Sequence, residues 1–195
     1  KIEGLGEWGI AEGGIYENWH ERLFDTNEIS KRPGVVSAFG MDFGFTNDPT
    51  SLSCALVDIP NRELYIFDEL YEKALLIDEI AQRVIEKGYG KELIIADSAE
   101  PKSIVDLRRY GLRKIARAEK GPDSIKNGIQ YIQQYTIFVH PRCVNAINEL
   151  SNYVWDTNKY DEPINKPIDE YNHFLDALRY SMERIRKKDK MKRGA

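Results

Sequence analysis

Three apolar runs early in the chain, joined by short turns, constrain its fold more than any other feature. The runs cover residues 35–43, 51–58 and 64–70, and the segments between them, 44–50 and 59–63, are rich in turn-forming residues. Strands that are joined by such short connections usually pair antiparallel. The sequence therefore predicts a three-stranded antiparallel meander, in which the first strand is buried.

After the meander, the pattern changes to an alternation of helices and strands. Apolar residues keep helical spacing from about 75 to 85, and a short apolar strand follows at 93–97. Further helices are expected over 101–110, 123–134 and 143–153, further strands over 114–118 and 137–140, an irregular loop over 155–168, and a final helix after it. A meander followed by this alternation indicates a mixed sheet with helices on its faces.

Composition agrees with one domain of ordinary size. The chain has 195 residues, of which 42% are hydrophobic and 31% charged, so it can bury a sizeable core. No apolar run approaches the ~18 residues of a membrane span. The two cysteines, Cys54 and Cys143, lack metal-ligand spacing, and we expect both to be reduced and buried.

Residues 1–34 are rich in glycine and aromatic side chains without a sustained period, and they end in a strong turn signal. We expect them to form a connecting arm that packs on something else, with one domain boundary near residue 34. The missing initiator methionine favours a fragment of a longer protein. His20, within the arm, is expected to be a surface or packing residue.

The formal net charge of −4 does not favour nucleic-acid binding by itself, but it hides a local asymmetry. Basic residues gather at 108–117 and again in the C-terminal stretch 184–193. Such patches can bind phosphates when the acids gather elsewhere. A solvated helix end is the alternative interpretation of each run.

The final helix carries two faces with different chemistry. His173, Asp176 and Tyr180 are spaced to share one face of a helix. The other face is an apolar stripe that can hold the helix against a core, formed by Phe174, Leu175, Leu178 and Met182. An imidazole and a carboxylate on an anchored helix indicate part of a site that other segments complete.

Two other aspartates are placed to complete that site. Asp42 lies at the end of the first strand and Asp97 ends the strand at 93–97, where mixed sheets commonly place ligands. If both converge with Asp176, the three carboxylates repel unless a cation compensates them. Oxygen ligands with one imidazole suit Mg²⁺ or Mn²⁺ better than zinc, and two such ions can promote attack on a phosphodiester. Taken singly, each aspartate also has a non-catalytic interpretation: Asp42 as a turn residue, Asp97 as a helix cap and Asp176 as a surface acid.

Three segments resemble motifs of one protein family. Residues 40–50 (GMDFGFTNDPT), 95–104 (IADSAEPKSI) and 169–180 (DEYNHFLDALRY) resemble, in order, motifs of the large terminase subunit of tailed bacteriophages. The similarity is to its C-terminal nuclease domain and covers residues 34 to about 185. It implies an RNase H-like fold, with a five-stranded mixed sheet flanked by helices. It also implies metal-dependent endonuclease cleavage of concatemeric viral DNA.

The resemblance assigns roles to individual residues. It makes Asp42, Asp97 and Asp176 the ligands of two Mg²⁺ or Mn²⁺ ions. It places His173 beside the metals, as a ligand or as a group that orients water or phosphate, and a packing role is the alternative. Asp48 and Glu100, near the first and second acids, are expected to support a metal through water. Glu170 and Asp169 are further candidates, for which the alternative is a place in the first helical turn, stabilised by the helix dipole. RNase H enzymes carry a further acid, which has no clear match here.

Cationic residues are expected to hold the DNA backbone without reading its sequence. They are Lys102, Arg108, Arg109, Lys120, Lys126 and Arg179. For Arg179 an ion pair with Asp176, three residues before it, is an equal alternative.

The family's full subunit also carries an ATPase motor. The pattern G-x-x-x-x-G-K-[ST] is absent here, so we expect no ATPase activity, and residues 1–34 would join motor to nuclease. Implied partners are double-stranded DNA, the portal protein, the small terminase subunit and that ATPase domain, in the host cytoplasm and transiently at the procapsid portal. The alternatives are an RNase H-like junction resolvase or hybrid nuclease, and a non-catalytic module that docks on DNA or portal.

Overall fold

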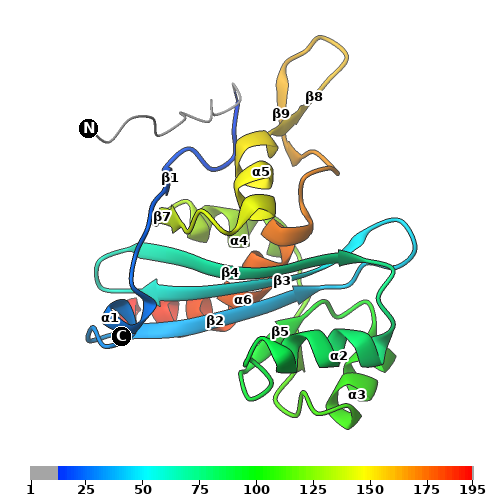
Figure 1. Cartoon of the computed structure of the whole chain (residues 1–195). Helices are drawn as coiled ribbons and strands as arrows, with labels where there is room; N and C mark the ends of the chain where they lie inside the picture. The colour runs from blue at the N-terminus through cyan, green and yellow to red at the C-terminus, as the bar shows by residue number, and fades with distance from the viewer. Residues whose placement is uncertain (1–12, 195) are drawn as a thin grey trace, which may run out of the picture.

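A computed structural model describes residues 13–194, which build a seven-stranded mixed sheet with helices on both faces (Figure 1). The strands lie in the order β1-β7-β4-β3-β2-β5-β6. Their bounds are β1 Trp19–Glu21, β2 Val35–Asp42, β3 Pro49–Asp58, β4 Glu63–Lys73, β5 Ile94–Ala96, β6 Ala116–Arg117 and β7 Thr136–Val139. The mixed α/β fold is confirmed, but the expected count of five strands is wrong. The edge strands β1 and β6, of three and two residues, extend the sheet.

The antiparallel meander is confirmed. β2 pairs with β3 from Val35 opposite Asp58 to Asp42 opposite Ser51, and β3 pairs with β4 along its whole length. Every residue of β3 is buried, because the strand has a neighbour on each edge and helices over each face.

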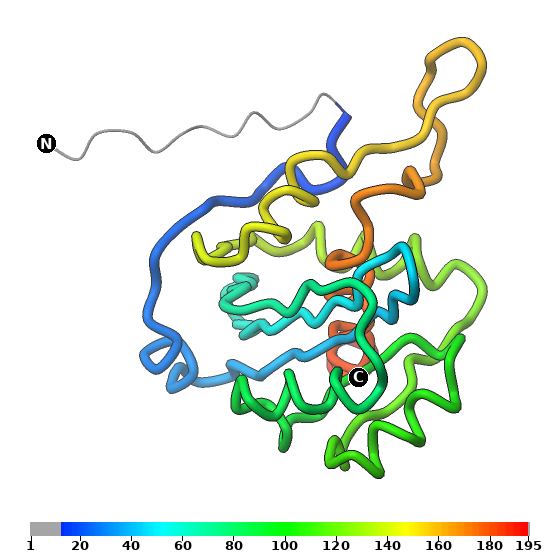
Figure 2. The backbone as a smooth tube through the Cα atoms, turned by 45° about the vertical axis from the view of Figure 1, so that its right-hand side comes forward, coloured from blue at the N-terminus to red at the C-terminus, as the bar shows by residue number. Residues whose placement is uncertain are grey.

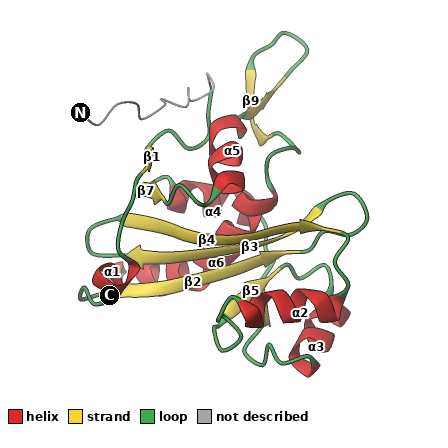
Figure 3. Cartoon of the chain, in the orientation of Figure 1, coloured by secondary structure: helices red, strands yellow, loops and turns green. Residues whose placement is uncertain are grey.

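The other strands join the meander in parallel. β5 lies beside β2 and β7 beside β4, and the edge strands β6 and β1 continue them outward. The helices that connect and cover these strands are α1 Thr26–Ser30, α2 Ile77–Glu86, α3 Pro101–Arg109, α4 Ser124–Ile132, α5 Val144–Asn152 and α6 His173–Arg193. Figure 3 shows the helices in red and the strands in yellow. Each expected helix is present within a few residues of its expected bounds.

Side-chain alternation along the strands divides the core between the two faces. Ala38 of β2 and Ala55 of β3 pack with α4, α5 and α6. Phe39 and Met41 of β2, with Cys54 of β3, pack with α2 and α3 on the opposite face. The even-numbered residues of β2, which include Asp42 at its end, therefore face α6.

Two segments differ from expectation. The predicted irregular loop contains a hairpin, β8 Trp155–Thr157 and β9 Pro163–Pro167, which stands away from the body in Figures 1 and 2. The described part of the predicted arm supplies β1 and α1. It buries Ile15 and Trp19 in the core beneath α4, α5 and α6, and Ile29 in a smaller cluster with Leu56 and Tyr65. Residues 1–12 lie outside the described residues, and the domain boundary near residue 34 stays a prediction.

Two smaller expectations concern cysteines and membranes. Cys54 and Cys143 are both buried and free, as expected. Within residues 13–194, no helix has the length and apolar character that crossing a bilayer requires.

Candidate functional site

The carboxyl ends of β2 and β5 bring two of the predicted acids side by side. These strands are parallel neighbours, with Met41 opposite Ala96, so the residues that follow, Asp42 and Asp97, leave the sheet at the same edge. The backbone amide of Asp97 continues the ladder by donating to the Met41 carbonyl at 3.0 Å. Parallel pairing thus joins two carboxylates that are 55 residues apart in sequence.

α6 brings the third acid and the histidine to this edge. The helix lies directly on β2, because a Cβ added at Gly40 would come within 1.8 Å of the Ala177 carbonyl oxygen. Glycine is required there for this close approach. Asp176 is the neighbour of Ala177, and His173 is the first residue of α6. The helix therefore starts at the edge where Asp42 ends its strand.

The histidine connects two of the predicted acids. Its Nδ1 lies 3.4 Å from Oδ2 of Asp42, and its Nε2 lies 3.7 Å from Oδ1 of Asp48. The first contact raises the pKa of His173, which favours the charged imidazolium. Asp48 lies in the loop between β2 and β3 and is largely exposed.

Burial and neighbouring charges shift the protonation of two of the acids, Asp42 and Asp176. The pKa of Asp42 is raised to about 6, mainly by burial; His173 opposes this rise, and the charges of Asp176 and Asp97 contribute to it. Burial also raises the pKa of Asp176, against the opposing effect of Arg179. Asp97 is thus close enough to disfavour the charge of both Asp42 and Asp176, and Asp176 that of Asp42.

Each of the three carboxylates has a basic partner of its own. Asp97 Oδ1 lies 3.0 Å from the ammonium of Lys120, and Asp176 Oδ1 lies 3.0 Å from the guanidinium of Arg179, while Asp42 faces His173. Among residues 13–194, no three His, Cys, Asp or Glu side chains are arranged as a ready-made metal cage. The acids gather at one edge of the sheet, but their oxygens point to separate basic side chains.

The donor set fits a divalent ion of the Mg²⁺ or Mn²⁺ type. It consists of carboxylate oxygens with one imidazole, and both cysteines are buried elsewhere in the core. Mutual repulsion among three half-buried acids is also what a divalent ion would relieve. An ion that binds Asp97 would have to replace Lys120, the exposed cation that neutralises this carboxylate in this conformation.

Arg179 and Lys120 differ in how firmly they are held. The Arg179 side chain is 10% exposed, and its guanidinium also lies 4.8 Å from the Tyr180 ring centre. Gly128 of α4 makes room for it, because a Cβ there would come within 2.6 Å of the arginine chain. The Lys120 side chain is 56% exposed on the loop before α4. Arg179 therefore makes the ion pair with Asp176 that was the alternative to a phosphate contact. Lys120, which was expected to contact DNA, is likewise paired with an aspartate, Asp97.

The remaining predicted residues, all of them within the described part of the chain, make no hydrogen bond or ion pair with the three aspartates or His173. Glu100 takes the position before α3 and makes no side-chain cap there. Asp169 and Glu170 precede α6, so the alternative of a place in its first turn is wrong for both. The chain turns at Tyr171, which has a φ of 55°, and the helix starts only at His173. The exposed cations are Lys102, Arg108 and Arg109 of α3 and Lys126 of α4.

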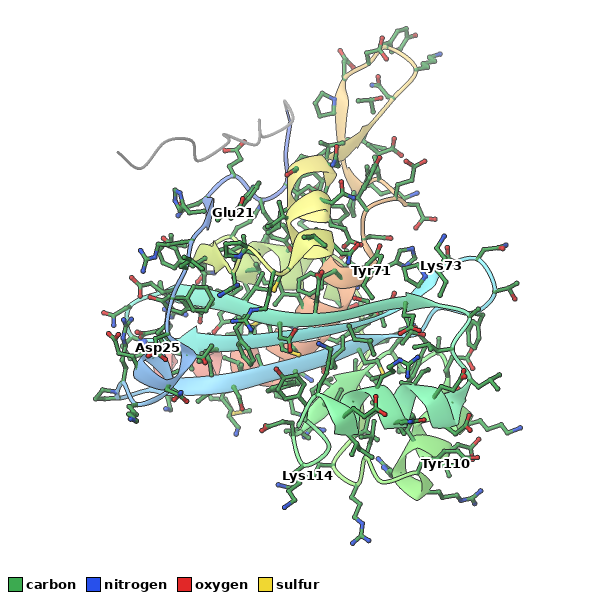
Figure 4. All side chains as sticks on the ribbon, viewed as in Figure 1. Glu21, Asp25, Tyr71, Lys73, Tyr110 and Lys114 are labelled. Carbon is green, nitrogen blue, oxygen red and sulfur yellow. The ribbon has the colours of Figure 1, made fainter. Side chains whose placement is uncertain are left out.

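Sequence reasoning missed a buried acid that holds the start of α6. Glu149 of α5 is 1% exposed, and it accepts hydrogen bonds from the Leu175 amide at 3.0 Å and the Tyr71 hydroxyl at 2.8 Å. Asn172, which occupies the N-cap position of α6, makes no side-chain cap. Figure 4 labels Tyr71 on β4, near the start of α6. The one available signal was that Glu149 falls three residues after Ala146, on the apolar face of α5.

Comparison with known proteins gives consistent matches. Residues 42–184 match the sequence family described as terminase RNase H-like domain. The terminase large subunit of Bacillus phage SPP1 is 36% identical over 152 residues, which cover 76% of this chain and 36% of that protein. The PBSX phage terminase large subunit of Bacillus subtilis is 34% identical over 145 residues, which cover 74% of this chain and 33% of that protein.

A solved structure agrees with these matches. The crystal structure of the large terminase nuclease domain from bacteriophage SPP1 with bound Mn superimposes with a TM-score of 0.80 and 32% sequence identity. The match covers 88% of this chain and 99% of that one. The chain spans about a third of the length of the curated relatives that it matches.

Proposed function

Because the chain belongs to the terminase RNase H-like domain family, we propose that it cuts concatemeric double-stranded viral DNA during packaging. Its fold is the RNase H-like fold of a large terminase nuclease domain. One observation carries the proposal. Asp42, Asp97 and Asp176 gather where the carboxyl ends of β2 and β5 meet the start of α6, close enough to raise the pKa of Asp42.

In this proposal, Asp42, Asp97 and Asp176 hold the metal and His173 lies beside it. Two divalent ions, when bound, would supply an activated water and stabilise the leaving oxygen. The solved relative from phage SPP1 has bound Mn, which supports a divalent ion here. His173, which contacts both Asp42 and Asp48, would orient the first carboxylate or a phosphate oxygen.

The surrounding cations would position the duplex. The exposed Lys102, Arg108 and Arg109 of α3 and Lys126 of α4 would contact backbone phosphates, which carry no sequence information. Cutting would then be weakly sequence-specific and set by the assembly. Arg179 would stay paired with Asp176 and align that carboxylate for the metal.

The rest of the packaging machine is also part of the proposal. The curated relatives are about three times longer than the matched region, which leaves room for an ATPase domain in the same polypeptide. We propose that residues 1–34 lead towards such a domain. The portal protein and the small terminase subunit would be further partners, at the procapsid portal in the host cell.

The test is cleavage of supercoiled plasmid by the purified chain in Mn²⁺. We expect nicked and linear products, and Asp42→Asn should lower the cleavage rate by at least about a hundredfold. Asp78→Asn is the matched control, since Asp78 is an exposed acid on α2, and its rate should stay unchanged. Equal cleavage by wild type and Asp42→Asn would refute the assigned site.

The choice of substrate separates the proposal from its alternatives. Linear duplex, four-way junction and RNA–DNA hybrid of matched length should be compared in Mn²⁺. We expect the plain duplex to be cut at least as fast as the others. A strong preference for junction or hybrid would favour a resolvase or hybrid nuclease, and DNA binding without cutting or metal binding would favour a docking module.

A further inference from the structure

Lys120 holds a metal-binding acid in a contact that is easily exchanged. It lies in the loop between β6 and α4, and its ammonium is 3.0 Å from Asp97 Oδ1. The same oxygen accepts the Ala99 amide at 3.1 Å. Because more than half of the lysine side chain is exposed, water and salt can replace the contact at little cost. Arg179, which is 10% exposed, lacks this freedom.

A cavity beside Lys120 offers another place for an anion. The cavity has a volume of about 240 Å³ and lies between α4 and α6. Its lining includes Asp176 and three cations, Lys120, Arg179 and Arg186. The Nε of Arg186 is buried without a hydrogen-bond partner among the described residues, so a donor there is unsatisfied.

The acids of this cavity do not compete strongly for those cations. Glu119 pairs with Lys187, and Glu183 accepts the Glu119 amide and also lies 3.4 Å from Lys187. Asp176 is paired with Arg179. Lys120 and Arg186 are therefore the lining cations that can still bind an incoming anion, and a DNA backbone phosphate is the anion that the proposed substrate supplies.

We propose that Lys120 is an exchangeable counter-ion that neutralises Asp97 until a DNA phosphate enters the cavity between α4 and α6. Transfer of the ammonium from the carboxylate to the phosphate then leaves Asp97 free to bind a divalent ion. This inference rests on the proposed nuclease function. It makes DNA binding and metal binding mutually favourable, because coupling between two ligands is reciprocal.

Metal affinity without DNA gives the first test. Mn²⁺ is titrated by calorimetry into wild type, Lys120→Gln and Lys120→Arg. Without its internal competitor, Lys120→Gln should bind Mn²⁺ about two- to fivefold more tightly, the range expected for release of one exposed ion pair. Lys120→Arg keeps the charge and should resemble wild type.

Lys87→Gln is the matched control. Lys87 forms a lysine–aspartate pair of similar length, 3.1 Å, with Asp68 away from the site. Its removal should leave Mn²⁺ affinity unchanged. Unchanged or weaker binding by Lys120→Gln would overturn the role of Lys120, whereas a wild-type chain that binds no Mn²⁺ would overturn the metal site itself.

The coupling gives the second test. Binding of a short fluorescein-labelled duplex is measured by anisotropy in EDTA and in Ca²⁺, used here as an oxygen-seeking divalent ion. Ca²⁺ should raise duplex affinity in wild type, and the factor should fall towards one in Lys120→Gln. An equal factor in both proteins would overturn the coupling.

Discussion

Two sets of shielded carboxylates lie within this chain and differ in what neutralises them. Glu69 of β4 and Glu149 of α5 accept hydrogen bonds from backbone amides at the starts of α5 and α6. Asp42, Asp97 and Asp176 each face a basic side chain, and among the described residues only Asp97 adds an amide contact. Amides at a helix start are fixed in place, whereas an exposed side-chain cation such as Lys120 can turn away. The first set, the structural acids, is therefore suited to hold the fold. The second set, the exchangeable acids, includes a carboxylate, Asp97, whose counter-ion can exchange.

The two sets are also physically connected. Glu69 caps α5 by accepting the amides of Asn145 and Ala146 at 2.9 Å each, and Glu149 of that helix then caps α6. A carboxylate at a helix start also interacts favourably with the helix dipole. The two caps tie the start of α6, and with it His173, to β4 of the sheet. The geometry of the exchangeable acids therefore depends on the structural acids, Glu69 and Glu149.

Asp97→Asn should have the largest effect on cleavage with little effect on stability. We expect the Mn²⁺-dependent cleavage rate to fall by at least about a hundredfold, because the amide is a poor metal ligand in place of a carboxylate. The free energy of unfolding in urea should change by less than about 1 kcal/mol, since the ion pair lost is with an exposed lysine. A loss of several kcal/mol would show that Asp97 belongs with the structural acids.

Glu149→Ala should have the reverse signature. It leaves the buried amides of Phe174 and Leu175 and the Tyr71 hydroxyl without their acceptor, so the free energy of unfolding should fall by about 2–4 kcal/mol. Glu86→Ala, at an exposed position on α2, is the control and should change it by less than about 0.5 kcal/mol. If Glu149→Ala were as stable as this control, the proposed cap of α6 would be unimportant.

The contrast between the two sets also explains how far the sequence could be read. Asp42 and Asp97 were predictable, because each ends an apolar strand and the ends of parallel neighbours meet. Glu149 was not, because its role depends on α5 packing beside the start of α6, and neither segment encodes that contact locally. Local pattern therefore finds residues at element ends better than residues buried between elements.

The same limit applies to the fold. The meander of β2, β3 and β4 followed from long apolar runs, but β1 and β6 are too short to show a period. The hairpin was hidden because Pro163 and Pro167 bound β9, and proline argues against a strand unless the strand lies at an edge. The delayed start of α6 depends on a left-handed Tyr171, which the residue type does not predict.

A pH series on Glu149→Gln sharpens the comparison further. Burial raises the pKa of Glu149, against the hydrogen bonds that stabilise its charge. The folded state therefore keeps the proton to higher pH than the unfolded state does. Across that window, which begins near the ordinary glutamate pKa of about 4.3, unfolding free energy falls as pH rises. The difference between wild type and Glu149→Gln, measured in urea from pH 4 to 8, should thus shift against wild type as pH rises. A difference that shifts the other way would mean that the amide bonds outweigh burial.

The smallest expected effect comes from Tyr71→Phe, which touches both sets at once. The hydroxyl donates to Glu149 at 2.8 Å, and the ring lies edge-on to His173 with centres 6.5 Å apart. Phenylalanine keeps the ring and removes one of several donors to the carboxylate, so the free energy of unfolding should fall by about 1 kcal/mol. Because the backbone amides still hold Glu149, α6 should keep its start and the Mn²⁺-dependent cleavage rate should stay within about threefold of wild type. A hundredfold loss of rate at this modest cost in stability would show that the hydroxyl acts on the exchangeable acids directly, and the division between the two sets would fail at Tyr71.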